Sequence, residues 1–203
     1  MDLDLSSLDE PLAIPHEFEI DLHCVVVANH RFTLEAIDRS EDEDLKSIQE
    51  GFELEDHATI TSMMSHHQNF YDDLRQAACR LAVVALVTRL QHWIGRFMAQ
   101  LKVPTSKGRQ SKLAKQLEAL NNRLGVGPVP VVFFENIVTV RDSVIHGDSR
   151  AEWEFDGPRR VADEYRNPSG DVELTDDQLK ESIQKAIQQV KWYDEKMHSI
   201  VTR

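Results

Sequence analysis

The sequence predicts an all-α protein, an antiparallel helical bundle with one small β-hairpin or flap inserted at about residues 150–174. Glycine and proline are scarce, at 8 and 7 of 203 residues, which disfavours a turn-rich sandwich or barrel. From Phe70 to Met98 the apolar residues recur in steps of three and four, as on one face of a helix. Between 150 and 174 this period is lost, and Gly157-Pro158 and Asn167–Gly170 predict turns.

The first part of the chain carries mixed signals. Residues 1 to about 17 contain many acids and two prolines and are expected to be loosely held. Over residues 20–37 the β-branched run at 22–27 favours a strand, whereas the apolar spacing fits a helix. We prefer the helix, because no partner strands are predicted nearby. The acidic run Ser40–Asp44 is expected to form a loop or the first turn of a short helix.

Four further helices are predicted in order. The longest covers about residues 55–101 and ends before Pro104. A shorter one covers 110–124, where one stripe is formed by Leu113, Leu117, Leu120 and Leu124. After a break rich in glycine and proline, the spacing predicts a helix over 131–145. The final helix opens at Thr175–Gln178, where threonine and glutamine three positions apart form a capping box.

Composition narrows the class of protein. The net charge of -12 argues against tight binding of nucleic acid over the whole surface, but leaves room for a small basic site. The cysteines, Cys24 and Cys79, form no C-x-x-C motif, and Cys79 is expected to be a core thiol. We therefore expect no cofactor and no metal. The N-terminus has no signal-peptide pattern and the longest apolar stretch is short, so a soluble, cytoplasmic protein is expected.

The residues with the most informative chemistry lie at the end of the helix over 131–145, in the run Arg141-Asp142-Ser143-Val144-Ile145-His146-Gly147. Arginine stays charged at any physiological pH, and histidine titrates near neutrality. Arg141 and His146 differ by about 140° around a helix, whereas Asp142 and His146 share a face. Asp142 is therefore placed to orient the imidazole, and Gly147 stands in the position of a C-terminal cap.

Metal-free cleavage of RNA needs few groups beyond these. A histidine takes the proton of the 2′-hydroxyl or protonates the leaving 5′-oxygen, and an arginine holds the scissile phosphate. One histidine does not easily serve both steps. A two-fold dimer would supply the second copy.

The motif Arg141-Asp142-x3-His146 resembles the signature of HEPN domains, in which an arginine and a polar residue precede a histidine by four to six positions. The following Gly147-Asp148, the long helix upstream, the β-like insertion and the closing helix near Leu174-Thr175 are also similar. The type it most resembles is RiboL-PSP and its relatives found near defence genes. The resemblance covers about residues 55–203, which we treat as one helical domain, with 1–54 as an acidic N-terminal arm and a first element.

The resemblance implies a helical bundle, a homodimer with both motifs at the interface, and a metal-independent endoribonuclease of a toxin–antitoxin or anti-phage system. It implies that Arg141 and His146 are catalytic and that Asp142 supports them. A weaker expectation from the charge pattern is that RNA meets the basic stretch formed by Lys107, Arg109, Lys112 and Lys115.

Other interpretations remain open at this stage. His146 and Arg141 can serve as a helix cap and an ion pair with Glu135 or Asp142. The basic stretch can be a solvated face or meet an acidic partner. The whole chain can be a catalytically silent HEPN scaffold, or an antitoxin-like regulatory partner with an acidic surface. For His57, His66 and His67 solvated positions are favoured over metal binding, because their spacing forms no metal-binding pair.

Overall fold

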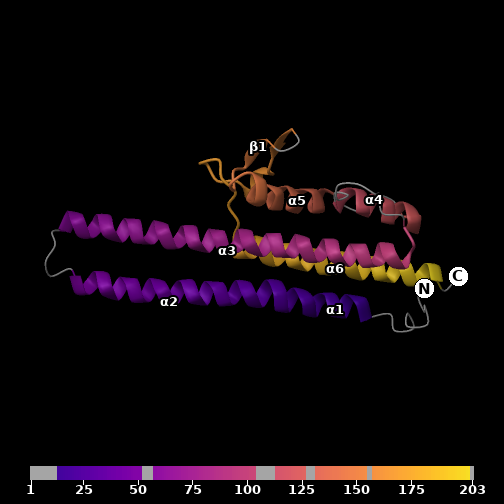
Figure 1. Cartoon of the computed structure of the whole chain (residues 1–203), viewed down its shortest axis with the longest axis horizontal. Helices are drawn as coiled ribbons and strands as arrows, with labels where there is room; N and C mark the ends of the chain where they lie inside the picture. The colour runs from indigo at the N-terminus through magenta and orange to yellow at the C-terminus, as the bar shows by residue number, and fades with distance from the viewer. Residues whose placement is uncertain (1–12, 52–56, 104–112, 127–130, 155–156, 202–203) are drawn as a thin grey trace.

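The computed structural model describes residues 13–51, 57–103, 113–126, 131–154 and 157–201. The chain begins with α1 (Ala13–Leu22), a π-helix η2 (His23–Val27) and α2 (Ala28–Gly51), which follow one another as a single rod. α3 (His57–Gln100) runs back along this rod, so the two form a long helical hairpin (Figure 1).

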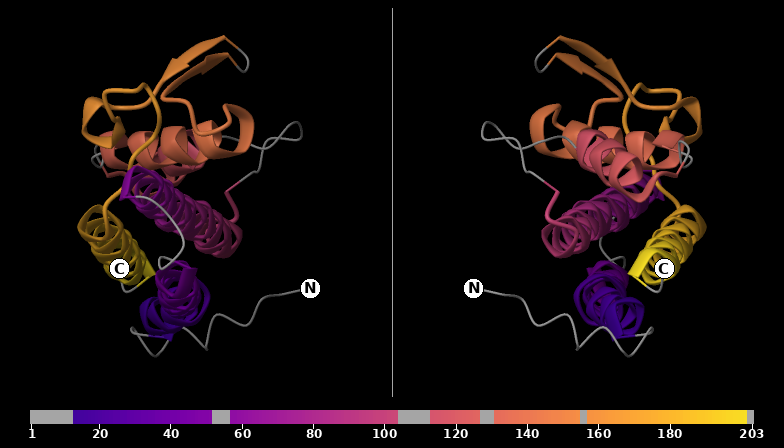
Figure 2. Two further views of the ribbon diagram at one scale, coloured as in Figure 1. Left: turned by 90° about the vertical axis from the view of Figure 1, so that its left-hand side faces the viewer. Right: turned by 90° about the vertical axis from the view of Figure 1, so that its right-hand side faces the viewer.

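The remaining helices cover one half of this hairpin. α4 (Leu113–Leu124) and α5 (Val131–His146) lie on one side of the second half of α3, and α6 (Asp176–Val201) lies against α3 and α1 (Figures 1 and 2). Between α5 and α6 come β1 (Glu152–Glu154), β2 (Pro158–Arg160) and a 3-10 turn, η4 (Asp163–Tyr165). β1 and β2 pair antiparallel. The predicted all-α bundle with a small hairpin is therefore confirmed.

One hydrophobic core joins all the helices except α2. Its centre is the second half of α3, where Leu86, Leu90, Ile94 and Phe97 are fully buried. The four leucines predicted to form a stripe on α4 are all buried, as are Phe134, Ile137 and Val140 of α5. Phe18, Leu22 and Val26 belong to the same core, so the rod formed by α1 and η2 packs with the later helices.

The far half of the hairpin projects beyond this core. We call residues 28–51 and 57–75 the projecting hairpin. Where the structure describes burial in this hairpin, Tyr71 is buried and all other side chains are exposed or partly buried. The Tyr71 hydroxyl donates to Asp44 Oδ2 at 2.5 Å, and Arg75 pairs with Asp38 at 2.8 Å and with Glu41. Polar contacts join these two helices, together with partly buried apolar side chains such as Leu34, Ile37 and Met64.

The structure corrects the sequence interpretation at two places. The acidic run Ser40–Asp44 lies in the middle of α2, not in a loop or at the start of a short helix. Arg75 of α3 pairs with Glu41 and the Tyr71 hydroxyl donates to Asp44, and no local pattern reveals these partners. α1 begins at Ala13, so the helix also includes residues 13–17, which were expected to be loosely held. Residues 1–12 lie outside the described part.

The other predicted elements are confirmed. Residues 20–37 are helical throughout, with a π turn at 23–27. The Thr175 capping box is present, since the Gln178 amide donates to Thr175 Oγ1 at 3.2 Å and the Thr175 amide donates to Gln178 Oε1 at 2.8 Å. Within the described residues, none of the helices combines the length and apolarity that crossing a bilayer requires.

Candidate functional site at the end of α5

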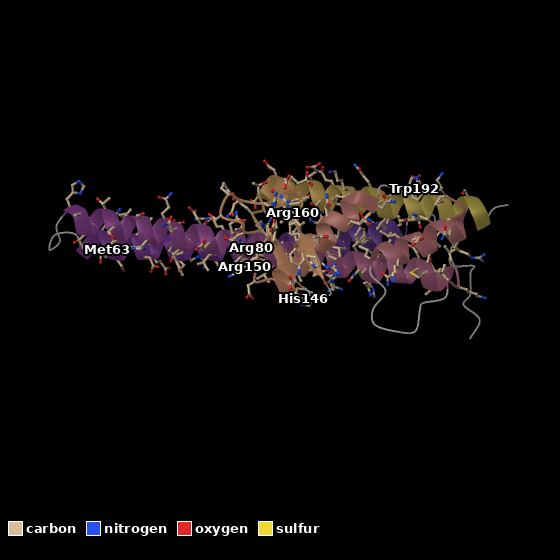
Figure 3. All side chains as sticks on the ribbon, turned by 90° about the horizontal axis from the view of Figure 1, so that it is seen from above. Met63, Arg80, His146, Arg150, Arg160 and Trp192 are labelled. Carbon is tan, nitrogen blue, oxygen red and sulfur yellow. The ribbon has the colours of Figure 1, made fainter. Side chains whose placement is uncertain are left out.

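α5 carries the predicted site because its two faces differ. Phe134, Ile137 and Val140 are buried on one face and anchor the helix on the bundle. Arg141 and Asp142 follow at the edge of the buried face, with side chains 17% and 18% exposed. His146 is the last residue of α5 and is exposed. Figure 3 labels His146 at one edge of the molecule, and it also labels Arg150 and Arg160, which belong to the segment that follows the helix.

A compact charge cluster surrounds Asp142. Arg141 Nε lies 2.7 Å from Asp142 Oδ1, and Arg159 Nη1 lies 3.7 Å from Asp142 Oδ2. The Arg141 contact is an ion pair without the alignment of a hydrogen bond, because Nε has no hydrogen-bond partner within the described residues. Two guanidinium groups flank one carboxylate here, and guanidinium is the side-chain group best suited to bind a phosphate.

The turn after α5 is built tightly on Ser143. Its buried hydroxyl donates to the carbonyl of Arg150 at 2.6 Å, and its own carbonyl accepts from the amides of Gly147 at 2.8 Å and Ser149 at 3.2 Å. Asp148 and Ser149 adopt left-handed φ angles of 49° and 65°. The last turn of α5 and the backbone of His146 are therefore held in one conformation.

Gly147 is not the left-handed C-terminal cap that the sequence predicts for this helix. The left-handed residues are Asp148 and Ser149, and Gly147 is not among the positive-φ residues that the structure describes. A Cβ at Gly147 would lie 2.8 Å from Trp153 Cγ and 2.9 Å from Trp153 Cβ. Glycine is required at position 147 because the indole of Trp153, on β1, packs directly on the backbone at the end of α5.

The structure brings some of the predicted residues together and adds one. Arg141 and Asp142 are in contact, and Arg159 of β2 joins them. The sequence interpretation missed Arg159, because only the folded hairpin returns it to α5. Among the residues expected to meet RNA, Lys115 lies exposed on α4. The other three, Lys107, Arg109 and Lys112, lie outside the described residues.

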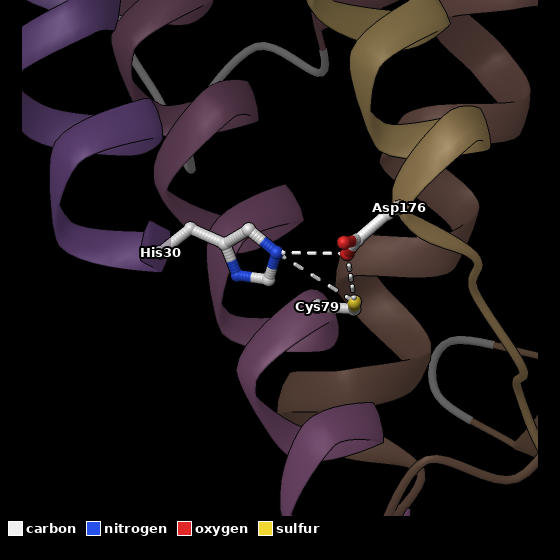
Figure 4. Close-up of side chains that lie close together, drawn as sticks. All are labelled: His30, Cys79 and Asp176. Carbon is white, nitrogen blue, oxygen red and sulfur yellow. Dashed lines mark hydrogen bonds and ion pairs between the residues drawn. The ribbon is translucent and has the colours of Figure 1, made fainter. Parts of the chain in front are cut away.

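A second group of reactive side chains lies on other elements. His30 of α2, Cys79 of α3 and Asp176 of α6 meet where these three helices approach one another (Figure 4). Burial raises the pKa of the Cys79 thiol to about 12, so it stays protonated at neutral pH and is a poor nucleophile. The sequence interpretation missed this group, because His30 and Asp176 are 49 and 97 positions from Cys79 and form no motif.

Comparison with known proteins finds no matching family model, no similar curated protein and no similar solved structure. Function must therefore be argued from the chemistry of the two groups of side chains described above. The HEPN resemblance rests on the motif of α5 and its helical context.

Proposed function

We propose that this protein is a metal-independent endoribonuclease of HEPN type, which acts as a homodimer and serves as a toxin or anti-phage effector. One observation carries the proposal. An exposed histidine ends α5, four residues after Asp142, and Arg141 and Arg159 flank that aspartate. This arrangement offers a phosphate site and a proton-transfer group within one helix end.

In the proposed reaction Arg141 and Arg159 hold the scissile phosphate of RNA. The 2′-oxygen attacks phosphorus and the P–O5′ bond breaks, which yields a 2′,3′-cyclic phosphate and a 5′-hydroxyl. His146 accepts the proton of the 2′-hydroxyl, and His146 of the second copy protonates the leaving 5′-oxygen. Asp142 holds the two guanidinium groups in position, and in the HEPN resemblance it also supports the histidine.

The surface beside His146 supports a dimer at this position. Ile145 precedes the histidine on the last turn of α5 and is 51% exposed. Single exposed apolar residues are common on monomers, so Ile145 is an available contact for a second copy, and the dimer itself comes from the HEPN resemblance. A two-fold axis here would bring two histidines to one phosphate.

The test compares RNA cleavage by the purified full chain without added divalent cations. We expect the wild type to cleave single-stranded RNA and His146→Ala to lose about 100-fold or more of the rate, the usual contribution of a general acid or base. His66→Ala, which removes an exposed histidine from the projecting hairpin, is the matched control and should cleave normally. Arg159→Ala should weaken cleavage mainly through RNA binding.

Expression in cells gives the complementary readout, which is growth arrest. We expect arrest with the wild type and none with His146→Ala. If the wild type cleaves no RNA and both chains arrest growth equally, the nuclease proposal is wrong. Equal cleavage by the wild type and His146→Ala would also overturn it.

A catalytically silent interaction module is the second candidate. It is favoured by the projecting hairpin, which presents Phe32 and Phe70 to solvent at 57% and 56% exposure. In a scaffold or antitoxin-like protein the cluster around Asp142 would be a structural ion-pair network. His146→Ala would then leave every function intact, and a basic partner would dissociate in high salt because the attraction is electrostatic.

A further inference from the structure

The three side chains in Figure 4 come from different helices and point at one another. His30 Nε2 lies 3.0 Å from Asp176 Oδ1, Cys79 Sγ lies 3.4 Å from the same oxygen, and Cys79 Sγ lies 3.9 Å from His30 Nε2. One imidazole nitrogen, one sulfur and one carboxylate oxygen thus form a small triangle.

The size of this triangle matches one face of a zinc coordination tetrahedron. Zinc binds sulfur at about 2.3 Å and nitrogen or oxygen at about 2.1 Å, so tetrahedral ligand atoms lie about 3.3–3.6 Å apart. Each of the three separations is within about 0.4 Å of that geometry, a change that small side-chain rotations supply. The donor set is also the one that zinc prefers, with imidazole, thiolate and carboxylate.

The backbone around the triangle is fixed before any ion arrives. Gln76 makes two hydrogen bonds with the backbone of Leu174, at 3.1 and 3.0 Å, and Arg80 donates to the carbonyl of Val172 at 2.9 and 2.6 Å. These residues flank Cys79 on α3 and tie down the segment that leads to Asp176. The capping box at Thr175 then fixes the first turn of α6.

The π-helix η2 directs His30 into the triangle. A π turn contains one residue more than an α turn, so the helix after it is rotated by about 100° relative to an uninterrupted α-helix. The Ala28 amide donates to the carbonyl of His23, the spacing of a π turn. The His30 side chain is only 10% exposed, and Nδ1 is buried with no hydrogen-bond partner within the described residues. The ring therefore faces the triangle through Nε2, although this orientation leaves Nδ1 unpaired.

We propose that His30, Cys79 and Asp176 bind a Zn²⁺ ion, with a water molecule as the fourth ligand on the side where Asp176 is half exposed. When the ion binds, Cys79 releases its thiol proton to water. Bonds to the metal then take the place of the hydrogen bonds among the three side chains. The ion links α2, α3 and α6 where the projecting hairpin leaves the bundle. None of the three ligands belongs to α5, so this site is independent of the proposed nuclease chemistry.

The experiment uses the full chain, stripped of metal and titrated with Co²⁺ as a spectroscopic substitute for Zn²⁺. A thiolate ligand gives a sulfur-to-cobalt charge-transfer band in the near ultraviolet, which surface histidines do not give. We expect the band to saturate at one Co²⁺ per chain and to disappear in Cys79→Ser. Cys24→Ser, which alters the exposed cysteine on η2, is the matched control and should retain the band.

The other two ligands are tested by conservative changes. His30→Gln and Asp176→Asn should weaken Co²⁺ binding by at least about tenfold, because loss even of a supporting group costs that much. Zn²⁺ should displace Co²⁺ and raise the melting temperature of the wild type, because a ligand that binds only the folded chain stabilises it. Circular dichroism establishes that each variant is folded.

Three results would overturn the zinc site. The first is a folded wild-type chain that gives no charge-transfer band. The second is a band that survives Cys79→Ser or vanishes in Cys24→Ser. The third is equal Co²⁺ affinity in the wild type, His30→Gln and Asp176→Asn.

Discussion

At the scale of single residues, the most constrained point is the contact between Gly147 and Trp153. The indole lies where a Cβ would be, and its neighbour Ser143 is fully buried and hydrogen bonded. Any side chain at Gly147 must push β1 away from α5. The same movement would displace Arg159, because Arg159 pairs with Trp153 across the β-hairpin.

Gly147→Ala is expected to destabilise the protein by about 1–3 kcal/mol, the usual cost of overpacking, and to weaken RNA binding through Arg159. Denaturant unfolding measures the first effect. Gly95→Ala is the control, since a Cβ there meets nothing within 4 Å and its place inside α3 predicts a gain of about 0.5–1 kcal/mol. Equal effects of the two substitutions would contradict the steric explanation.

Asp194 gives a pH-dependent prediction. Its side chain is 4% exposed, and burial raises the pKa of its carboxyl above 3.8, although His198 at 3.6 Å partly opposes this. The folded state then holds its proton more tightly than the unfolded state, so stability from this group is present at low pH and is lost as pH rises above 3.8. Asp194→Asn should make unfolding free energy less dependent on pH in that window and raise it at pH 7. A lower free energy at pH 7 would contradict the prediction.

At the scale of elements, the hairpin of α2 and α3 has two parts of different character. Residues 78–98 of α3 hold much of the hydrophobic core, whereas residues 57–70 have no buried side chain among those described. Local stability follows buried apolar contact, so opening of the projecting hairpin should cost far less than global unfolding. The contacts of Tyr71 and Arg75 contribute to that cost.

Native-state hydrogen exchange should therefore separate the two parts, with amides of 57–70 and 31–51 exchanging much faster than those of 78–98. Tyr71→Phe removes the hydrogen bonds to Asp44 and Ser40 and should lower the local opening free energy by about 0.5–1.5 kcal/mol without changing global unfolding. Tyr193→Phe, which breaks a buried 2.8 Å bond to Asn121, should lower global stability instead. Uniform protection along α3 would refute the separation.

At the scale of the whole molecule, charge and apolar exposure are unevenly distributed. The net charge is -12, yet two arginines, Arg141 and Arg159, gather around Asp142. RNA would therefore be attracted only locally, and its binding should weaken only modestly with salt, because few phosphates are neutralised. Next to this cluster Ile145 is exposed, and it marks the face where a second copy would complete the proposed site.

Ile145→Glu is expected to convert a dimer to a monomer and to abolish RNA cleavage, because it places a charge in an apolar contact. Light scattering coupled to size-exclusion chromatography measures the mass. Ile20→Glu is a close control, since Ile20 of α1 is 50% exposed and Ile145 is 51% exposed. A wild-type chain that stays monomeric at high concentration would argue against the shared site.

Most of the helical framework follows from the sequence alone. The leucine stripe of α4, the core face of α5 and the capping box at Thr175 each depend on residues three or four positions apart. Such spacing is a local property of a helix, so the sequence is enough to predict it. The motif of Arg141, Asp142 and His146 could be placed at a helix end for the same reason.

Contacts between distant segments were decided only by the tertiary structure. Within the acidic run at 40–44, Glu41 and Asp44 meet partners on α3, and Arg159 reaches Asp142 because the β-hairpin folds back on α5. His30, Cys79 and Asp176 form a triangle because a π turn and three packed helices bring them together. No sequence period or motif predicts these contacts, because they depend on how whole helices pack. The sequence by itself determined the helices and the candidate catalytic pair, and packing determined which charges and ligands surround them.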